Sequence, residues 1–153
     1  MTAPDTPQTQ APALLALADF PFPTALVVTG APAPDGGALY ESGDVDEIFP
    51  FASVTKPIVA WSALVAVDRG LLDLDAPAGA PAPDGATIGH LLSHSSGIAT
   101  DSDERLATPG TRRIYSNRGI EILGERLQEA TGTPLETWVE STVLEPLGMA
   151  SVL

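Results

Sequence analysis

A serine and a lysine three residues apart form the most chemically suggestive pair in the sequence. The segment FASVTKPIVAW, residues 51–61, contains Ser53 and Lys56, and Lys56 is the only lysine because every other basic residue is an arginine. Arginine stays protonated at any workable pH, whereas lysine can lose its proton when it is buried or crowded. A serine hydroxyl is a weak nucleophile until an adjacent base takes its proton. The pair therefore suggests a nucleophile, Ser53, and a proton acceptor, Lys56.

The elements around this pair should bring the two side chains together. We predict a central helix over 54–69 that ends at Gly70 in a left-handed cap, and residues three apart on a helix share one face. Its residues are apolar nearly all round, which is typical of a helix buried on most sides. Pro57 in the first turn predicts an irregular start. Ser53 would lie at the helix N-terminus, where the partial positive charge and an unpaired N–H favour an oxyanion.

Composition limits the classes of function. The chain has 153 residues, of which 44% are hydrophobic, and this suits one domain with a real core. The net charge of −13 argues against a nucleic-acid partner, since phosphates require a basic surface. The absence of cysteine excludes disulfides, cysteine metal sites and cysteine nucleophiles. The first 20 residues lack the basic start of a signal peptide, and no apolar run is long enough to span a bilayer, so we expect a cytoplasmic location.

The remaining pattern predicts a short hairpin followed by a mainly helical region. Residues 1–12 are expected to be a flexible tail and 12–20 a short helix, followed by strands over 24–30 and 38–42 joined by a turn. Two strands alone are barely stable in water, so this sheet should be incomplete without further strands.

Three further helices are predicted in the second half of the chain. A helix capped by Thr87 should run to Leu92, and another should cover 118–130 before Gly132. Thr133, Pro134 and Glu136 form the pattern of a capping box that starts a last helix, whose buried face would include Trp138.

Other candidate sites in the sequence are weaker. His90 and His94 have the spacing of a helical zinc pair, but the run HLLSH lacks the glutamate of a zinc protease and suggests no third ligand. We expect no metal, and these histidines should serve packing and loop hydrogen bonds. Ser95 and Ser96 lack the context of a nucleophile elbow. The acidic residues near Asp101 are expected to form a solvated surface.

Four segments carry a resemblance to a known family. They are FASVTKPIVAWSALVAVDRGLLDLD, TIGHLLSHSSGI, PGTRRIYSNRGIEILGERLQEATG and VLEPLGM, between about residues 50 and 149. Their order and spacing resemble the serine β-lactamase and penicillin-binding-protein-like SxxK hydrolases, a superfamily that includes class C β-lactamases, D-Ala-D-Ala peptidases and esterases.

The resemblance implies roles for the matching residues. Ser53 would be the acylated nucleophile, and Lys56 its proton acceptor or electrostatic partner. Tyr115, in the family's YxN motif, would share the base role, and the sequence leaves open which of Lys56 and Tyr115 is the acylation base. Asn117 would hydrogen-bond Lys56 or a substrate amide. Without the family, Tyr115 is more simply a packing residue, and Asn117 is equally well the N-cap of the helix that follows.

The resemblance also implies a fold and its organisation. The class is α+β, β-lactamase/transpeptidase-like, with an antiparallel sheet packed on the central SxxK helix and a helical subdomain. Residues 13–153 would be the first half of such a domain, with 24–53 as its N-terminal strands, 54–69 as its central helix and 70–153 as its mainly helical region. The family's third motif, a Lys- or His-x-Gly on a later strand, has no counterpart, so the sheet is incomplete in this chain.

The implied function is acyl transfer through an acyl-enzyme on small esters or amides, which is esterase-like, D-Ala-D-Ala peptidase-like or β-lactamase-like, with no cofactor. The partner would be a small ester, amide or β-lactam-like substrate. The chain would be a fragment, a cleavage product or one subunit of a split protein, and in the last case a second chain would carry the C-terminal half of the fold. The alternative is a catalytically silent binding or regulatory module on the same scaffold. The two hypotheses differ in whether Ser53 reacts.

Overall fold

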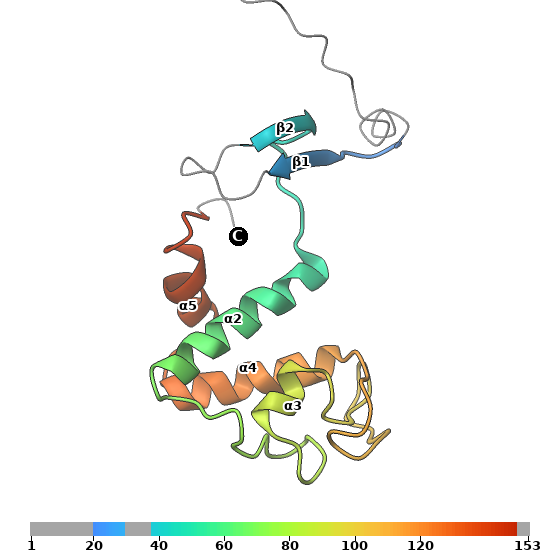
Figure 1. Cartoon of the computed structure of the whole chain (residues 1–153), viewed down its shortest axis with the longest axis vertical. Helices are drawn as coiled ribbons and strands as arrows, with labels where there is room; N and C mark the ends of the chain where they lie inside the picture. The colour runs from blue at the N-terminus through green and yellow to red at the C-terminus, as the bar shows by residue number, and fades with distance from the viewer. Residues whose placement is uncertain (1–19, 30–37, 150–153) are drawn as a thin grey trace, which may run out of the picture. The chain divides into compact units, whose positions relative to one another are not determined.

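The computed structural model describes residues 20–29 and 38–149, which fall into two compact units divided after Pro50 (Figure 1). Each unit is described by itself. The predicted tail at 1–12, the predicted turn at 31–37 and nearly all of the helix predicted at 12–20 lie outside the described residues.

The first unit contains the predicted hairpin strands. β1 (Ala25–Thr29) and β2 (Ala38–Gly43) pair antiparallel, with Leu26 opposite Ser42 and Val28 opposite Tyr40. Val27 and Val28 point to opposite faces, and they are 49% and 42% exposed, so neither face of the described sheet is fully covered. The prediction of two strands in an incomplete sheet is confirmed.

The central helix of the second unit starts irregularly, as its proline predicts. A 3₁₀ turn, η2 (Ala52–Val54), leads into α2 (Thr55–Asp68), and Gly70 follows in the left-handed region at a φ of 70°. The first turn is 3₁₀ because Pro57 has no N–H with which to form an α-helical bond. The predicted helix and its left-handed end are therefore confirmed.

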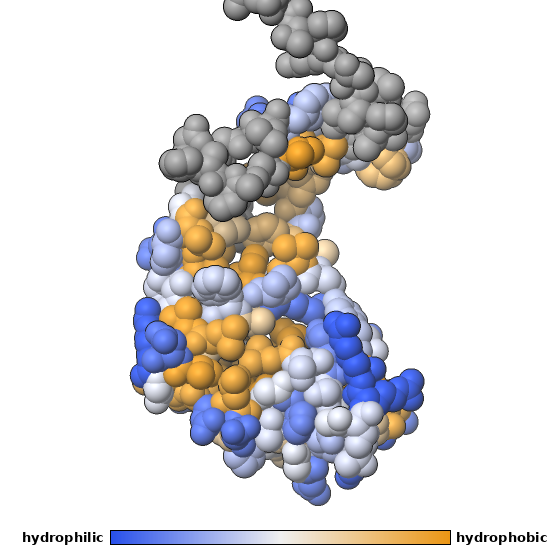
Figure 2. Space-filling view, viewed as in Figure 1, coloured by the Kyte–Doolittle hydropathy of each residue, from blue (hydrophilic) through white to orange (hydrophobic). Residues whose placement is uncertain are grey.

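The prediction that this helix is buried on most sides is wrong for the described chain. α2 packs against α4, α5 and η3 through one face, and Val59, Ala63 and Ala66 are buried there. On the other side Trp61 is 61% exposed and Leu64 48% exposed. An apolar sequence shows that a helix can be buried all round, but it does not supply the elements that would cover it. Figure 2 shows apolar surface over the part of the unit where α2, α4 and α5 lie.

α3 (Ile88–Leu92) and α4 (Asn117–Thr131) agree closely with the predicted helices. Thr87 is the N-cap of α3, and the ring of His90 completes a capping box by accepting the Thr87 N–H at 3.1 Å. α4 ends at Gly132, which has a φ of 66°. Its N-cap is Ser116 rather than Asn117, because the buried Ser116 hydroxyl accepts the Gly119 N–H at 2.8 Å.

The last helix forms where predicted, but the predicted capping box does not. α5 (Leu135–Val139) continues into a π-helical turn, η3 (Glu140–Leu144), and Pro134 is the N-cap without a side-chain hydrogen bond. Thr133 does not cap α5, and its N–H instead donates to the Thr131 hydroxyl at 3.3 Å. The Leu135 N–H donates to Gln128 of α4 at 3.0 Å, so a neighbouring helix satisfies the group that a cap would serve.

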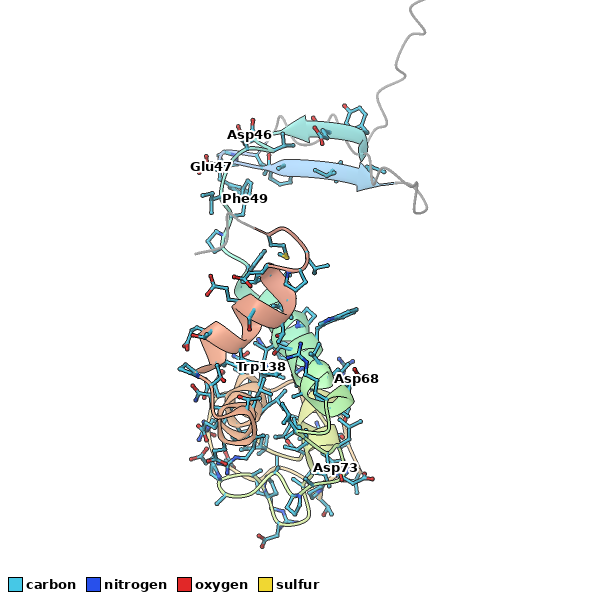
Figure 3. All side chains as sticks on the ribbon, turned by 90° about the vertical axis from the view of Figure 1, so that its left-hand side faces the viewer. Asp46, Glu47, Phe49, Asp68, Asp73 and Trp138 are labelled. Atoms are coloured by element: carbon cyan, nitrogen blue, oxygen red, sulfur yellow. The ribbon has the colours of Figure 1, made fainter. Side chains whose placement is uncertain are left out.

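The core of the second unit lies between these helices. Its buried members come from α2, α3, α4, α5 and the connecting loops, and they are Val59, Ala63, Ala66, Ala78, Ala86, Ile88, Leu91, Ile98, Ile122, Leu123, Leu127 and Trp138. Trp138, labelled in Figure 3, joins α5 to α2 because its indole N–H donates to the Ser62 carbonyl at 3.0 Å. The guanidinium of Arg69 lies 5.2 Å from the centroid of the Trp138 ring. These contacts hold α2, and with it the Ser53–Lys56 segment, against the rest of the unit.

Candidate active site

Ser53 and Lys56 meet at the start of the central helix. Ser53 lies in the 3₁₀ turn and Lys56 in the first turn of α2, and the Lys56 Nζ donates to the Ser53 Oγ at 3.2 Å. Ser53 is exposed and Lys56 is half-buried. The residue before the serine, Ala52, has a φ of 45°, a region that costs a residue with a Cβ about 1–3 kcal/mol. The turn that presents Ser53 is therefore locally strained.

Tyr115 joins this pair from the loop before α4. The Lys56 Nζ lies 4.9 Å from the centroid of the Tyr115 ring, and the Tyr115 side chain is partly open to solvent. Hydrogen bonding by Lys56, and then by Ser53, lowers the pKa of the Tyr115 phenol below its ordinary value. The fold thus brings together Ser53, Lys56 and Tyr115, three residues for which the sequence suggested one site.

The backbone around Tyr115 is held by several hydrogen bonds. The Thr100 hydroxyl donates to the Tyr115 carbonyl at 3.0 Å, and the Ser116 N–H donates to Nδ1 of His94 at 3.2 Å. The rings of His94 and Tyr115 lie with their centroids 4.8 Å apart. Burial, followed by the charges of Arg113 and Lys56, lowers the pKa of His94. His94 therefore makes both the packing contact and the loop hydrogen bond expected of it.

Asn117 lies one residue beyond the Ser116 cap, in the first turn of α4. Its side-chain nitrogen donates to the Asp101 carboxylate at 2.6 Å. Asp101, Asp103 and Glu104 are exposed, so the predicted solvated surface is confirmed, and Asp101 in addition binds the YxN segment. The role of Asn117 towards Lys56 or a substrate stays a prediction.

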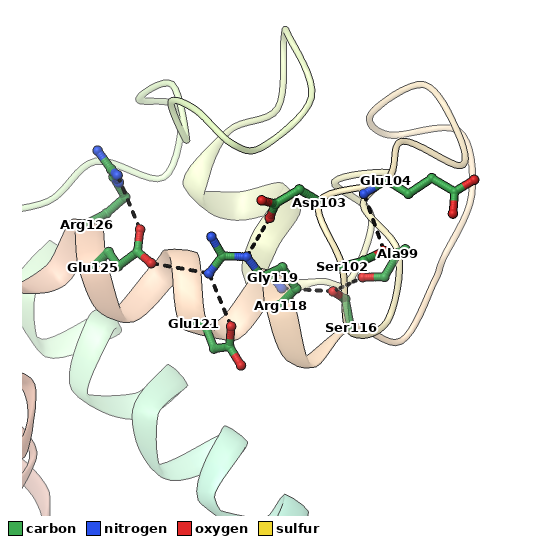
Figure 4. A network of polar contacts seen from close by, with 10 residues as sticks. All are labelled: Ala99, Ser102, Asp103, Glu104, Ser116, Arg118, Gly119, Glu121, Glu125 and Arg126. Carbon is green, nitrogen blue, oxygen red and sulfur yellow. Dashed lines mark hydrogen bonds and ion pairs between the residues drawn. The ribbon is translucent and has the colours of Figure 1, made fainter.

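Arg118 ties the acidic loop to α4, as Figure 4 shows. Its guanidinium contacts Asp103 at 2.6 Å, Glu121 at 3.1 Å and Glu125 at 3.2 Å. These hydrogen bonds, that of Asp103 first, raise the pKa of Arg118. The acidic partners are largely exposed, so each pair contributes little to stability. Only the pair with Asp103 joins the loop to α4, since Glu121 and Glu125 lie on the same helix as Arg118.

The sequence did not single out Thr100, Ser116 or the contact of His94 with Tyr115. One usable signal was present, because Ser116 precedes a helical pattern and serine is a favoured N-cap. Within residues 20–29 and 38–149, no three His, Asp or Glu side chains form a group that could hold a metal ion. No helix in the described part is long and apolar enough to cross a membrane.

A protein-family model, Beta-lactamase, matches residues 27–152 of this chain. The chain belongs to the beta-lactamase family. The resemblance stated from the sequence is therefore confirmed, and the match spans Ser53, Lys56, Tyr115 and Asn117.

Proteins with different named activities are similar in sequence to this chain. Esterase EstB of Burkholderia gladioli is 36% identical over 68% of this chain and 38% of its own length. The D-alanyl-D-alanine-carboxypeptidase/endopeptidase AmpH of Escherichia coli is 25% identical over 69% of this chain and 36% of its own. The chain thus spans well under half the length of either relative.

Solved structures show the same beta-lactamase/transpeptidase-like fold. A beta-lactamase from Mycobacterium bovis is 46% identical with a TM-score of 0.78, over 90% of this chain and 48% of that one. The octameric penicillin-binding protein homologue from Pyrococcus abyssi is 26% identical with a TM-score of 0.67, over 76% of this chain and 37% of that one. The chain therefore has part of the fold, and the predicted fold class is confirmed.

Proposed function

We propose that this chain carries the nucleophile and the base of a serine hydrolase that works through an acyl-enzyme on small esters or amides. The observation that carries the proposal is the 3.2 Å contact between the Lys56 Nζ and the Ser53 Oγ. Such a distance lies within the reach that proton transfer between a nucleophile and its base requires. The lowered pKa of the adjacent Tyr115 phenol supports the same site.

The chemistry proceeds in two steps. The Ser53 oxygen attacks the substrate carbonyl carbon, and its proton passes to a basic Lys56 amine or Tyr115 phenolate. The leaving alcohol or amine takes that proton as its bond to the carbonyl carbon breaks, which leaves an ester on Ser53. Water then attacks this ester with help from the same base, which releases the carboxylic acid and restores the Ser53 hydroxyl.

The surrounding groups have supporting roles in this proposal. The Ser53 N–H at the start of the helical segment would donate to the oxyanion. Asp101 holds the Asn117 side-chain nitrogen, which leaves the Asn117 carbonyl oxygen as the group that can accept a substrate N–H. Lys56 and Tyr115 both remain candidates for the acylation base.

The substrate class rests on the family. Esters come first, because the relative with 36% identity is an esterase, and a D-alanyl amide or a β-lactam would use the same acyl-transfer step. The chains of the relatives extend well beyond the region that matches this chain. We also propose that a complementary half of the fold, whether on a second chain or on the same polypeptide, completes the sheet and supplies a further oxyanion donor.

A burst experiment tests the proposal. The chain, alone and with a complementary half from a relative, is mixed with p-nitrophenyl acetate or nitrocefin, and the product released in the first turnover is measured. We expect a burst with the ester that disappears in Ser53→Ala. Thr55→Ala removes the neighbouring exposed hydroxyl and should keep the burst.

The absence of a burst in every case would contradict the hydrolase and favour a catalytically silent binding module. A burst that survives in Ser53→Ala would assign the reaction to another residue.

A further inference from the structure

His94 holds the chain on both sides of Tyr115. The Ile114 N–H donates to the His94 carbonyl at 2.7 Å, and the Ser116 N–H donates to the His94 Nδ1 at 3.2 Å. The two bonds therefore fix the residues directly before and after the tyrosine. Between them, the Tyr115 ring lies against the His94 ring, with centroids 4.8 Å apart and planes tilted by 37°.

We propose that His94 is a positioning residue that holds the Tyr115 phenol at Ser53 and Lys56, an inference that rests on the proposed function of this site. A tyrosine on a loop can turn about its backbone and its side-chain torsions, and each of these motions would carry the phenol away from Lys56. The two hydrogen bonds limit the first motion, and the ring contact limits the second. Small displacements of this kind can lower a rate about 10²-fold.

The two hydrogen bonds and the ring contact that His94 makes around Tyr115, here called the His94 clamp, require a neutral His94 ring. Nδ1 can accept the Ser116 N–H only when it carries no proton, so the proton of the neutral ring lies on Nε2. The charged and titratable groups that face the ring are Lys56 at the start of α2, and Arg113 and Tyr115 in the loop before α4. Burial and these two cations lower the pKa of His94, which favours the accepting form.

The backbone of His94 allows the parts of the clamp to be separated by substitution. Its φ is 56°, a left-handed conformation that glycine adopts freely and asparagine adopts more readily than most residues. His94→Asn keeps this conformation and can place an amide oxygen near the Nδ1 position, but it removes the ring. His94→Gly keeps only the backbone freedom. His94→Phe keeps the ring without the acceptor.

The first readout is the titration of the Tyr115 phenol, followed by tyrosinate absorbance in a Tyr40→Phe background. With His94 present, the midpoint should lie below the ordinary phenol pKa of about 10, because Tyr115 lies near Lys56 and Ser53. In His94→Gly and His94→Phe the midpoint should rise towards that ordinary value. In His94→Asn the midpoint should lie between those of the wild type and His94→Gly. His90→Asn is the matched control, because His90 also accepts a backbone N–H but does so at α3, and it should leave the midpoint unchanged.

The second readout is the rate at which a fluorophosphonate labels Ser53. We expect a decrease of about 10–100-fold in the glycine and phenylalanine variants and a smaller one in asparagine. Circular dichroism and thermal melting identify the variants that are folded, and the comparison uses these.

The two hypotheses can fail separately. Folded glycine and phenylalanine variants that keep both the wild-type midpoint and the wild-type labelling rate would overturn the positioning role of His94. A wild-type chain that is never labelled at Ser53 would overturn the proposed function. The Tyr115 midpoint would then decide the role of His94 by itself.

Discussion

The helices α2 and α4 differ in how far the described chain covers their apolar side chains. In the described chain, α4 buries the apolar side chains of Ile122, Leu123 and Leu127, and its exposed side carries glutamates that pair with Arg118 and Arg126. α2 buries small residues on one side, whereas the apolar side chains of Trp61 and Leu64 on its other side are exposed. The described chain therefore covers the apolar side chains of α4 but leaves those on the outer side of α2 exposed.

Because of this difference, the residues proposed to react and the residues that stabilise the fold lie on different helices of the second unit. Ser53 and Lys56 lie at the start of α2, whose outer side is exposed in the described chain, and α4 supplies much of the core against which α2 packs. Substitutions at the start of α2 should therefore reduce reactivity and spare the fold, and substitutions inside α4 should do the reverse.

The largest effect is expected from Lys56→Arg. The change keeps the positive charge but removes a side chain that can release its proton, so the labelling rate of Ser53 by a fluorophosphonate should fall about 10²–10⁴-fold. Thermal stability should change little, since Lys56 is not fully buried. Arg105→Lys, the reverse exchange at an exposed loop position, is the control and should leave the rate unaltered. An unchanged rate in Lys56→Arg would remove lysine from the proton-transfer step.

The next largest effect is a difference in stability loss between a leucine of α4 and a leucine of α2. Leu123→Ala in α4 empties a fully buried position and should lower the free energy of unfolding by about 2–5 kcal/mol. Leu64→Ala on the outer side of α2 should change it by no more than about 0.5 kcal/mol. Urea denaturation measures both. Equal losses would show that something covers the outer side of α2 in solution.

A smaller loss is expected from Ser116→Ala. The Ser116 hydroxyl caps α4 through the Gly119 N–H and donates to the buried Ala99 carbonyl at 2.6 Å, so its removal should cost about 1–2 kcal/mol. Ser141→Ala removes an exposed hydroxyl from η3 and serves as the control in the same denaturation series. A loss in Ser116→Ala no larger than that of the control would mean that water satisfies both groups.

The smallest expected effect is a pH dependence from His94. Its pKa is lowered in the folded chain, so the unfolded chain binds the proton more readily and protonation favours unfolding. The His94 contribution to stability should be fully present above pH about 6.5 and be lost as pH falls through and below that value. Thermal melts at several pH values should show a smaller acid loss in His94→Asn than in the wild type. The same acid loss in both would assign it to other groups.

The sequence predicted the features that depend on short-range pattern. The strands, the four helices near Val59, Leu91, Leu123 and Trp138, and the meeting of Ser53 with Lys56 all follow from residue spacing, because three positions on a helix span nearly one turn.

The features that it did not predict depend on contacts between distant segments. Gln128 replaces the cap expected from Thr133, Asp101 binds Asn117, and His94 lies against Tyr115 from 21 residues away. Such pairs are set by tertiary packing, about which local propensity and periodicity carry no information. The exposed side of α2 has the same origin, because an apolar helix does not specify which elements will cover it.

Peptide mapping by mass spectrometry after treatment with a fluorophosphonate would test most directly whether Ser53 is an activated nucleophile. We predict a single adduct, on the peptide that contains Ser53, in the wild type and in Thr55→Ala, and none in Ser53→Ala. A folded wild-type chain that stays unmodified with its complementary half present, or one that carries the adduct on another serine, would contradict an activated hydroxyl at the start of α2.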